Sequence, residues 1–305
     1  MARPNPSVGA IVVKQGRIIA RGWTGPGGRP HAEAVALSLA GEAARGGTLY
    51  VSLEPCAHQS ARGPACADLV AASGLARVVI GCADPDPRTA GEGCRRIEHA
   101  SIAVELVDSA ACKRSLAGYL TRITQGRPHI TLKLALSQDG CLARPPGESR
   151  WLTGEPARAH AHAMRARMDA ILVGSGTLAA DSPRLDVRLP GLEDRSPERW
   201  VLTSGNAPEG WQAMTAPQGV FAMGDAQYLM VEGGAKTARA FLGAGLVDRL
   251  MLYRAPVTIG AGVAAIPELT EAALAGRKSG WQLCDQRRLG NDVLDVYERS
   301  PCSPE

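Results

Sequence analysis

HAEAVALSLAG (residues 31–41) and VSLEPCAHQSARGPAC (residues 51–66) are the two stretches that decide the fold and the chemistry of the first half of this chain. The first begins a predicted helix with His31. The second is an apolar strand followed by Cys56 and Cys66. Because strand ends and helix starts face the same edge of an α/β sheet, we expect the histidine and the two cysteines to meet there.

One imidazole and two thiolates make a three-ligand zinc site that leaves the fourth position for water. Bound zinc lowers the pKa of that water to about 7, so hydroxide is available at neutral pH. Glu33 lies within reach of the water and can pass its proton to a ring nitrogen and to departing ammonia. An H-x-E element followed by P-C and a second cysteine is typical of zinc nucleobase deaminases. The sequence therefore predicts His31, Cys56 and Cys66 as zinc ligands and Glu33 as the catalytic residue.

The spacing of the cysteines leaves a second explanation open. Cys66 follows Cys56 by ten residues, and the alternative is a histidine at a helix start with two unrelated core thiols. The long spacing inserts the loop AHQSARGPA at the mouth of the predicted site. His58 and Arg62 in this loop are predicted to contact an anionic substrate, since arginine suits the geometry of phosphate. A solvated loop is the alternative for both residues.

Length, composition and charge limit the class of protein. The chain has 305 residues, 45% of them hydrophobic, which is enough for two domains with real cores. Its net charge of +4 is spread over interspersed acids and bases, which speaks against a nucleic-acid or membrane partner. The sequence has neither an apolar stretch of about 20 residues nor a signal-peptide start. We expect a cytoplasmic protein, and a homo-oligomer is compatible with these features.

Strands and helices alternate along the chain, which is typical of α/β layers with helices packed on a sheet. In the first half we expect a hairpin around residues 15–16 and helices over 31–44, 65–73 and 109–122. The polar stretch TQGRPH, residues 124–129, is the best linker, and the strand–helix pattern restarts after it. The predicted domains are therefore residues 1–125 and 126–305.

A strand, a glycine turn and a helix follow each other in YLMVEGGAKTARAFL, residues 228–242. Backbone N–H groups at Gly233, Gly234 and the start of the helix can form a cradle for phosphate, with Lys236 nearby. The pattern is neither a Walker A loop nor G-x-G-x-x-G. A bound anion at a helix N-terminus and an ordinary glycine turn therefore both remain open.

The stretch VGSGTLAADSPRLDVR, residues 173–188, also places glycines and hydroxyl groups after a strand, followed by Arg184 and Arg188. A flexible surface loop is the alternative explanation. His160 and His162 are two residues apart on a predicted helix, where they face different sides and make a poor metal pair. We expect both histidines at the surface.

The chain resembles the bifunctional riboflavin-biosynthesis deaminase/reductase family over nearly its whole length. Its first half carries, in the family's order, PNPSVGAIVV, PHAEAVAL, LEPCAHQSARGPACADLV and VVIGCADPDPRTAGEG. Its second half carries ITLKLALSQDG, GESRWLTG, DAILVGSGTLAADSPRLDVR and LMVEGGAKTARAFLGAGLVDRLMLYRAP. The resemblance implies an N-terminal cytidine-deaminase-like three-layer α/β domain and a C-terminal dihydrofolate-reductase-like α/β domain that uses NADPH. The implied substrate is 2,5-diamino-6-ribosylamino-4(3H)-pyrimidinone 5′-phosphate, which is deaminated before its ribosyl group is reduced to ribityl.

The resemblance also implies the residues that hold the cofactor and the substrate of the second domain. Contacts with NADPH are implied for Ala135, Trp151, Thr177, Asp181, Ser204, Gly234, Ala235, Lys236, Thr237, Ala238, Arg239 and Ala240. Contacts with the substrate and its phosphate are implied for Ser149, Arg165, Leu185, Arg188 and Glu232. Several arginines around one phosphate suit its need for bidentate, charge-assisted hydrogen bonds.

Two segments differ from the family pattern. The family usually has an amphipathic helix before PNP, whereas this chain begins MARPNP. Either the true start lies upstream of Met1 or, as we expect for the sequence given, the deaminase domain is without the usual first helix. The stretch 204–228 is shorter than in the family, beside the adenosine end of the cofactor, and weaker NADPH binding is expected. One alternative is an enzyme in which only one half is active. Another is a zinc nucleic-acid deaminase, which should carry stacking aromatics, but only 4% of the residues are aromatic.

Overall fold

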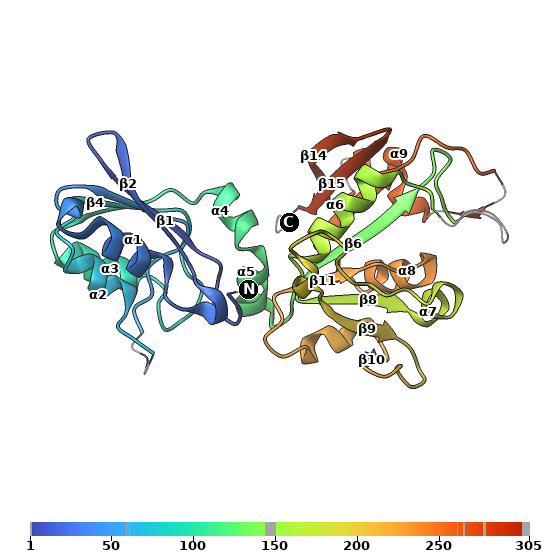
Figure 1. Ribbon diagram of the computed structural model, residues 1–305, viewed down its shortest axis with the longest axis horizontal. Coiled ribbons are helices and arrows are strands. Elements are labelled where there is room, and N and C mark those ends of the chain that lie inside the picture. Colours follow the sequence, from blue (N-terminus) through green and yellow to red (C-terminus); the bar gives the residue numbers. More distant parts are fainter. Residues whose placement is uncertain are drawn as a thin grey trace. The chain divides into compact units, whose positions relative to one another are not determined.

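The computed structural model describes residues 2–58, 60, 62–143, 151–260, 262–264, 266–276 and 279–300. The chain divides into two compact units between Arg127 and Pro128, and each unit is described by itself (Figure 1). The last helix of the first unit ends just before Gly126, whose left-handed conformation (φ 71°) stops the helix. No helix among the described residues is long and apolar enough to cross a membrane.

The first unit is built on a five-stranded sheet with the strand order β2-β1-β3-β4-β5. β1 pairs antiparallel with β2 and β3, whereas β3, β4 and β5 run parallel. Gln15 and Gly16 form the turn between β1 and β2, both with positive φ, as the predicted hairpin requires. The strands are β1 (Gly9–Lys14), β2 (Arg17–Trp23), β3 (Thr48–Val51), β4 (Arg77–Ile80) and β5 (Ala103–Leu106).

The helices of the first unit are shorter than predicted. The helix expected over 31–44 is observed as α1 (Ala32–Ala40). It ends before residue 44 because Gly41 adopts φ 51°, and the chain continues as the 3-10 helix η2 (Gly41–Ala44). The helix expected over 109–122 is divided at Leu116, whose φ of −102° and ψ of 8° interrupt it. The remaining helices are α2 (Cys66–Ala71), α3 (Glu92–His99), α4 (Ala110–Ser115) and α5 (Ala117–Gln125).

Close packing of α3 against the loop that follows β3 sets the position of the cysteine loop. α2 packs against both α1 and α3, and Figure 1 shows the three helices beside one another. At Gly93 on α3, a Cβ atom would lie 2.1 Å from the Pro55 carbonyl oxygen. Only glycine therefore lets α3 approach the backbone that leads directly into Cys56.

The second unit is built on an eight-stranded sheet with the order β10-β9-β8-β11-β6-β12-β15-β14. The pairs from β10 to β12 are parallel, and β15 and β14 are added antiparallel. The strands of this sheet are β6 (His129–Leu136), β8 (Ala170–Gly174), β9 (Glu198–Leu202), β10 (Gln212–Met214), β11 (Tyr228–Val231), β12 (Arg249–Arg254), β14 (Trp281–Leu289) and β15 (Asp292–Arg299). β7 (Cys141–Ala143) and β13 (Val263–Ala264) form a separate pair.

Helices α7 (Ser175–Asp181) and α8 (Ala235–Gly243) follow the neighbouring parallel strands β8 and β11. All residues of β8 are buried, which is typical of strands covered on both faces. Because both helices start where a parallel strand ends, their N-termini lie at the same edge of the sheet. The other helices of this unit are α6 (Glu155–Arg165) and α9 (Glu271–Ala275).

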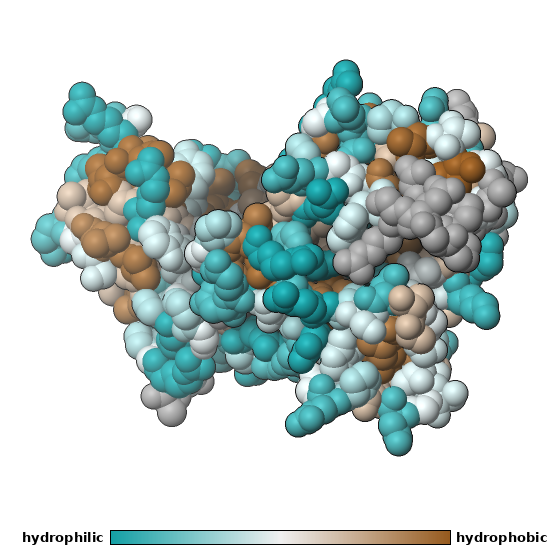
Figure 2. Space-filling view, turned by 45° about the vertical axis from the view of Figure 1, so that its right-hand side comes forward, coloured by the Kyte–Doolittle hydropathy of each residue, from teal (hydrophilic) through white to brown (hydrophobic). Residues whose placement is uncertain are grey.

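The stretch 204–228, which is expected to be shortened, contains β10 and the 3-10 helix η4 (Pro217–Ala222). Val220 of η4 is fully buried in the core of the second unit. Exposed apolar side chains occur in both units. On the face shown in Figure 2, the coloured apolar residues form several separate patches among hydrophilic ones.

Candidate active sites

A histidine and two cysteines come together at the helix starts of the first unit. His31 is the N-cap residue of α1, Cys66 is the first residue of α2, and Cys56 lies in the loop after β3. The His31 Nδ1 atom is 3.2 Å from Cys66 Sγ and 3.5 Å from Cys56 Sγ. Ligands at tetrahedral zinc, with Zn–S of about 2.3 Å and Zn–N of about 2.0 Å, lie roughly 3.5 Å apart. The donor atoms and their spacing therefore fit zinc.

The electrostatics of this cluster suit a metal and a proton carrier. A hydrogen bond from Cys66, and further interactions with His31, lower the pKa of Cys56 to about 4, so a thiolate is available. Burial raises the pKa of Glu33 to about 7, and interactions with both cysteines and His31 place this carboxyl beside the ligands. A buried carboxyl that titrates near neutrality can both accept and release a proton.

Glu54, in the same Glu-Pro-Cys segment, is a buried residue that the sequence analysis missed. Its carboxylate accepts hydrogen bonds from the backbone N–H groups of Asp84 (3.3 Å), Gly91 (3.2 Å) and Cys94 (3.2 Å). These bonds join the loop before Cys56 to the loop after β4 and to the start of α3. Glu54 therefore positions a predicted zinc ligand without belonging to the ligand set.

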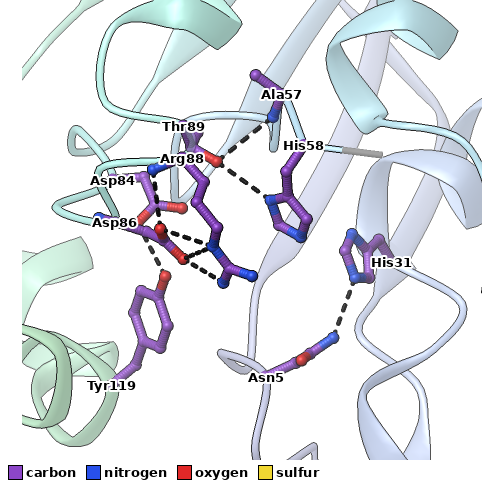
Figure 3. A network of polar contacts seen from close by, with 9 residues as sticks. All are labelled: Asn5, His31, Ala57, His58, Asp84, Asp86, Arg88, Thr89 and Tyr119. Atoms are coloured by element: carbon purple, nitrogen blue, oxygen red, sulfur yellow. Dashed lines mark hydrogen bonds and ion pairs between the residues drawn. The ribbon is translucent and has the colours of Figure 1, made fainter. Parts of the chain in front are cut away.

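The loop between the two cysteines carries the predicted anion contacts. His58 Nδ1 lies 3.5 Å from the Thr89 hydroxyl, which also accepts a hydrogen bond from the Ala57 N–H (Figure 3). Arg62 Nη2 donates a hydrogen bond to the Gly27 carbonyl at 2.9 Å. His58 is therefore held near the zinc cluster by the loop after β4, and Arg62 is attached to the segment before α1.

In the second unit, two glycines and a threonine bring α7 and α8 together. Thr237 is buried, and a Cβ atom on Gly174 would lie 2.1 Å from its Oγ1, while one on Gly233 would lie 2.5 Å from its Cβ. The Gly234 N–H donates to the Thr177 hydroxyl at 3.2 Å. Backbone N–H groups of two helix N-termini thus converge at one sheet edge, an arrangement suited to phosphate.

The other predicted cofactor positions lie around this edge. Asp181 is the exposed last residue of α7, and Ser204 is exposed after β9. Within the segment 234–240, Thr237 and Ala238 are buried, so their side chains pack inward and only their backbone can serve a ligand.

A cavity of about 190 Å³ in this unit brings cofactor and substrate predictions together. Ala135 and Trp151, predicted for NADPH, line it together with Arg165 and Arg188, predicted for the substrate. The described residues that line this cavity carry a strongly positive charge. It also contains Lys133, Arg158 and His162, which the sequence analysis did not place in a site. The predicted contact Ser149 lies outside the described residues.

Glu232 holds two of the cationic residues of this cavity in place. Arg165 donates to both carboxylate oxygens, with Nε 2.7 Å from Oε1 and Nη2 2.9 Å from Oε2. Lys133 Nζ is 3.6 Å from Oε2. Burial alone would raise the pKa of Glu232, but Lys133 and Arg165 lower it to about 2. The carboxylate is therefore charged at neutral pH and fixes the two cations.

The segment that carries Leu185 also borders this cavity. Leu185 is buried with a positive φ of 54°. The next carbonyl, of Asp186, accepts a hydrogen bond from Arg165 Nη1 at 3.1 Å. The Asp186 carboxylate pairs with Arg184 at 2.6 Å and with Arg188 at 3.4 Å. It therefore orients Arg188, the predicted contact with the substrate phosphate.

The expectation that His160 and His162 are surface residues is wrong, since both are half-buried. His160 Nδ1 lies 2.9 Å from the Tyr253 hydroxyl, and His162 Nδ1 lies 3.1 Å from the Asp186 carbonyl. They do face different partners, as their spacing on α6 predicts.

Comparison with known proteins gives two family matches, one in each unit. Residues 1–82 match the cytidine and deoxycytidylate deaminase zinc-binding region, and residues 128–223 and 221–294 match the RibD C-terminal domain. Riboflavin biosynthesis protein RibD of Aquifex aeolicus is 37% identical, covering 97% of this chain and 93% of that protein. RibD of Escherichia coli is also 37% identical, covering 95% of this chain and 92% of that protein. The chain belongs to the RibD family.

Solved RibD structures agree with this membership. Form 1 of Acinetobacter baumannii RibD has a TM-score of 0.84 at 30% identity, covering 98% of this chain and 94% of that one. The diaminohydroxyphosphoribosylaminopyrimidine deaminase/5-amino-6-(5-phosphoribosylamino)uracil reductase of Thermotoga maritima has a TM-score of 0.85 at 30% identity, covering 98% and 93%. The predicted fold class, a deaminase-like α/β domain followed by a reductase-like one, is confirmed.

RibD proteins are bifunctional, and this chain contains both the deaminase and the reductase domain. The predicted cofactors, zinc and NADPH, are those of the two domain types. Within the described part of the chain, His31, Cys56 and Cys66 form the one group of three potential ligands whose donor atoms all lie within 4.8 Å of one another.

Proposed function

We propose that this RibD family member catalyses two consecutive steps on 2,5-diamino-6-ribosylamino-4(3H)-pyrimidinone 5′-phosphate. In the first step, water replaces the 2-amino group and ammonia leaves. In the second, NADPH reduces the ribosyl group to ribityl. The observation that carries the proposal is the His31, Cys56 and Cys66 cluster with Glu33 beside it. We assign the first step to residues 1–125 and the second to residues 126–305.

In the deaminase domain, His31, Cys56 and Cys66 would hold zinc, which would supply an activated water for attack on the ring carbon. Glu33 would accept a proton from the attacking water and deliver protons to the ring nitrogen and to the leaving amino group. Its burial excludes competing solvent from the transfer. Glu54 and Gly93 keep the Cys56 loop in place beneath the reacting atoms. His58 and Arg62 are the proposed contacts with the anionic part of the substrate.

In the reductase domain, NADPH supplies the hydride. The first turn of α7, which contains Thr177, and the segment Gly234–Ala240 of α8 would hold its phosphates through backbone N–H groups. Asp181 and Ser204 are proposed as further contacts at this edge. Ala135 and Trp151, which line the basic cavity, would contact the cofactor there. Arg165, Arg188, Leu185, Glu232 and Ser149 are the proposed substrate contacts. We place the enzyme in the cytoplasm, because free thiolate ligands and reduced cofactor persist in a reducing compartment.

The test follows ammonia release and NADPH oxidation separately in the full chain. Wild-type protein should release ammonia from the diaminopyrimidine and oxidise NADPH only with the deaminated product. Cys66→Ser should lose zinc and ammonia release together while keeping NADPH oxidation on pre-deaminated substrate. Cys284→Ser is the matched control, because Cys284 is an exposed thiol on β14. Retention of both zinc and deamination by Cys66→Ser would refute the ligand assignment.

A further inference from the structure

Arg88 is an arginine beside the proposed deaminase site to which neither the sequence analysis nor the proposed mechanism gives a role. It lies in the loop after β4 and pairs with Asp86 two residues earlier. Its Nε is 2.9 Å from Asp86 Oδ1 and 3.1 Å from Oδ2, and its Nη2 also donates to Oδ2. One edge of the guanidinium is therefore fully engaged by the carboxylate.

The two partners of this ion pair differ greatly in exposure. The Asp86 side chain is 7% exposed and the Arg88 side chain 65% exposed. An ion pair with one partner so exposed contributes little to folding stability. Asp86 is itself held in place, because its N–H donates a hydrogen bond to Asp84 Oδ1 at 2.9 Å. Asp84 in turn accepts a hydrogen bond from the Tyr119 hydroxyl at 2.8 Å. The buried Asp86 carboxylate thus holds the Arg88 guanidinium in a fixed position that is exposed to solvent.

The loop that carries Arg88 is tied directly to the cysteine loop. Thr89 is fully buried, and its hydroxyl contacts both the Ala57 N–H and the His58 imidazole. Figure 3 shows the Arg88 guanidinium turned toward the side on which His58 and His31 lie. The position of Arg88 beside the site is therefore set by hydrogen bonds on both sides of the residue.

The chemistry of the free edge indicates what this cation binds. Guanidinium has five N–H donors in a planar fork, and Asp86 uses those of Nε and part of those of Nη2. Within the described ranges, no hydrogen bond from Arg88 Nη1 is found. The free Nη1/Nη2 edge can therefore donate two parallel hydrogen bonds, the geometry in which arginine binds phosphate.

We propose that Arg88, oriented by Asp86, binds the 5′-phosphate of the substrate in the deaminase step and makes this domain specific for the phosphorylated compound. The inference rests on the proposed function. In the view of Figure 3, His58 lies between the Arg88 guanidinium and His31, so we assign it to the part of the substrate nearer the ring. Asp86 is a positioning residue, because it acts only through Arg88.

The experiment compares deamination of the 5′-phosphorylated substrate with that of its dephosphorylated counterpart. Arg88→Gln should lower kcat/KM for the phosphorylated compound about 10- to 150-fold, the range for loss of a charge-assisted hydrogen bond, mainly through KM. The dephosphorylated compound should be affected less than about twofold. Arg88→Lys keeps the charge but loses the fork, so it should recover only part of the loss.

Arg95→Gln is the matched control, because Arg95 is 66% exposed and pairs with Glu92 at 2.8 Å on α3. Zinc content and NADPH oxidation report whether each variant is folded. An equal loss on both compounds, or no loss on either, would overturn the assignment of Arg88 to phosphate.

A binding measurement separates this inference from the proposed function. Ribose 5-phosphate is titrated calorimetrically into full-length Arg188→Ala, which removes a phosphate contact of the second domain, and into the same variant with Arg88→Gln added. Weaker binding to the double variant supports the role of Arg88 even if wild-type protein releases no ammonia, in which case the proposed function alone fails. Unchanged binding contradicts the role of Arg88.

Discussion

Replacement of Gly93 by alanine should disturb the zinc site from a distance. The added Cβ would lie 2.1 Å from the Pro55 carbonyl oxygen and 3.1 Å from Glu54 Oε1. A carbon and an oxygen atom in van der Waals contact are about 3.2 Å apart, so α3 or the backbone before Cys56 must shift by about 1 Å. Overpacking of this kind costs about 1–3 kcal/mol, and the upper end is expected because the nearest obstacle is backbone.

Thermal unfolding and zinc content measure the effect. A loss of about 3 kcal/mol corresponds to a melting temperature roughly 10 °C lower for a domain of this size. Zinc retention should fall with it, while NADPH oxidation on pre-deaminated substrate stays unchanged. Gly9→Ala is the control, because a Cβ on Gly9 has no described atom within 4 Å. Wild-type zinc content and stability in Gly93→Ala would refute the proposed packing of α3 on the cysteine loop.

Two further predictions concern the second domain. Gly174→Ala should raise the Kd for NADPH at least about tenfold without affecting zinc content. The reason is that the added Cβ would lie 2.1 Å from Thr237 Oγ1 and push α8 away from α7. Isothermal titration calorimetry measures the Kd, and an unchanged value contradicts the prediction. Lys133 and Arg165 outweigh burial and lower the pKa of Glu232 from 4.5 to about 2. The folded state therefore binds this proton less tightly than the unfolded state, so the stabilisation is present above about pH 4.5 and is lost as the pH falls toward 2. Urea unfolding at pH 5 and pH 3 should show this loss in wild type and a smaller loss in Glu232→Gln.

Alternation of strands and helices was enough to predict where His31 and the two cysteines meet. His31 starts a helix and Cys56 follows a strand, and elements of this kind place their ends at one sheet edge. The helix ends were predicted less well. Gly41 and Leu116 interrupt helices that their neighbours would continue, and α3 was missed because its buried face consists of only Gly93 and Ile97.

The local sequence pattern could not reveal residues whose roles depend on partners far away in the sequence. Glu54 depends on backbone donors 30 to 40 residues away. Lys133 sits in the largely buried strand β6, and its role follows only from its contact with Glu232, which comes after the different strand β11. Arg158 reaches the cavity by stacking on Trp151, with 5.2 Å between its Cζ and the ring centre. Such contacts depend on tertiary packing, which the sequence periodicity does not encode.

The central claim is that Glu33 moves protons at a zinc site, and Glu33→Gln tests it most directly. General acid–base catalysis contributes about 10²- to 10⁴-fold, and one carboxylate that serves several transfers should lie at the upper end. Ammonia release by this variant should therefore fall by about 10³- to 10⁴-fold, with zinc still bound and NADPH oxidation on pre-deaminated substrate intact. A residue that only supports the start of α1 would change stability by about 1 kcal/mol or less and leave turnover alone. Ammonia release within about threefold of wild type would contradict the account.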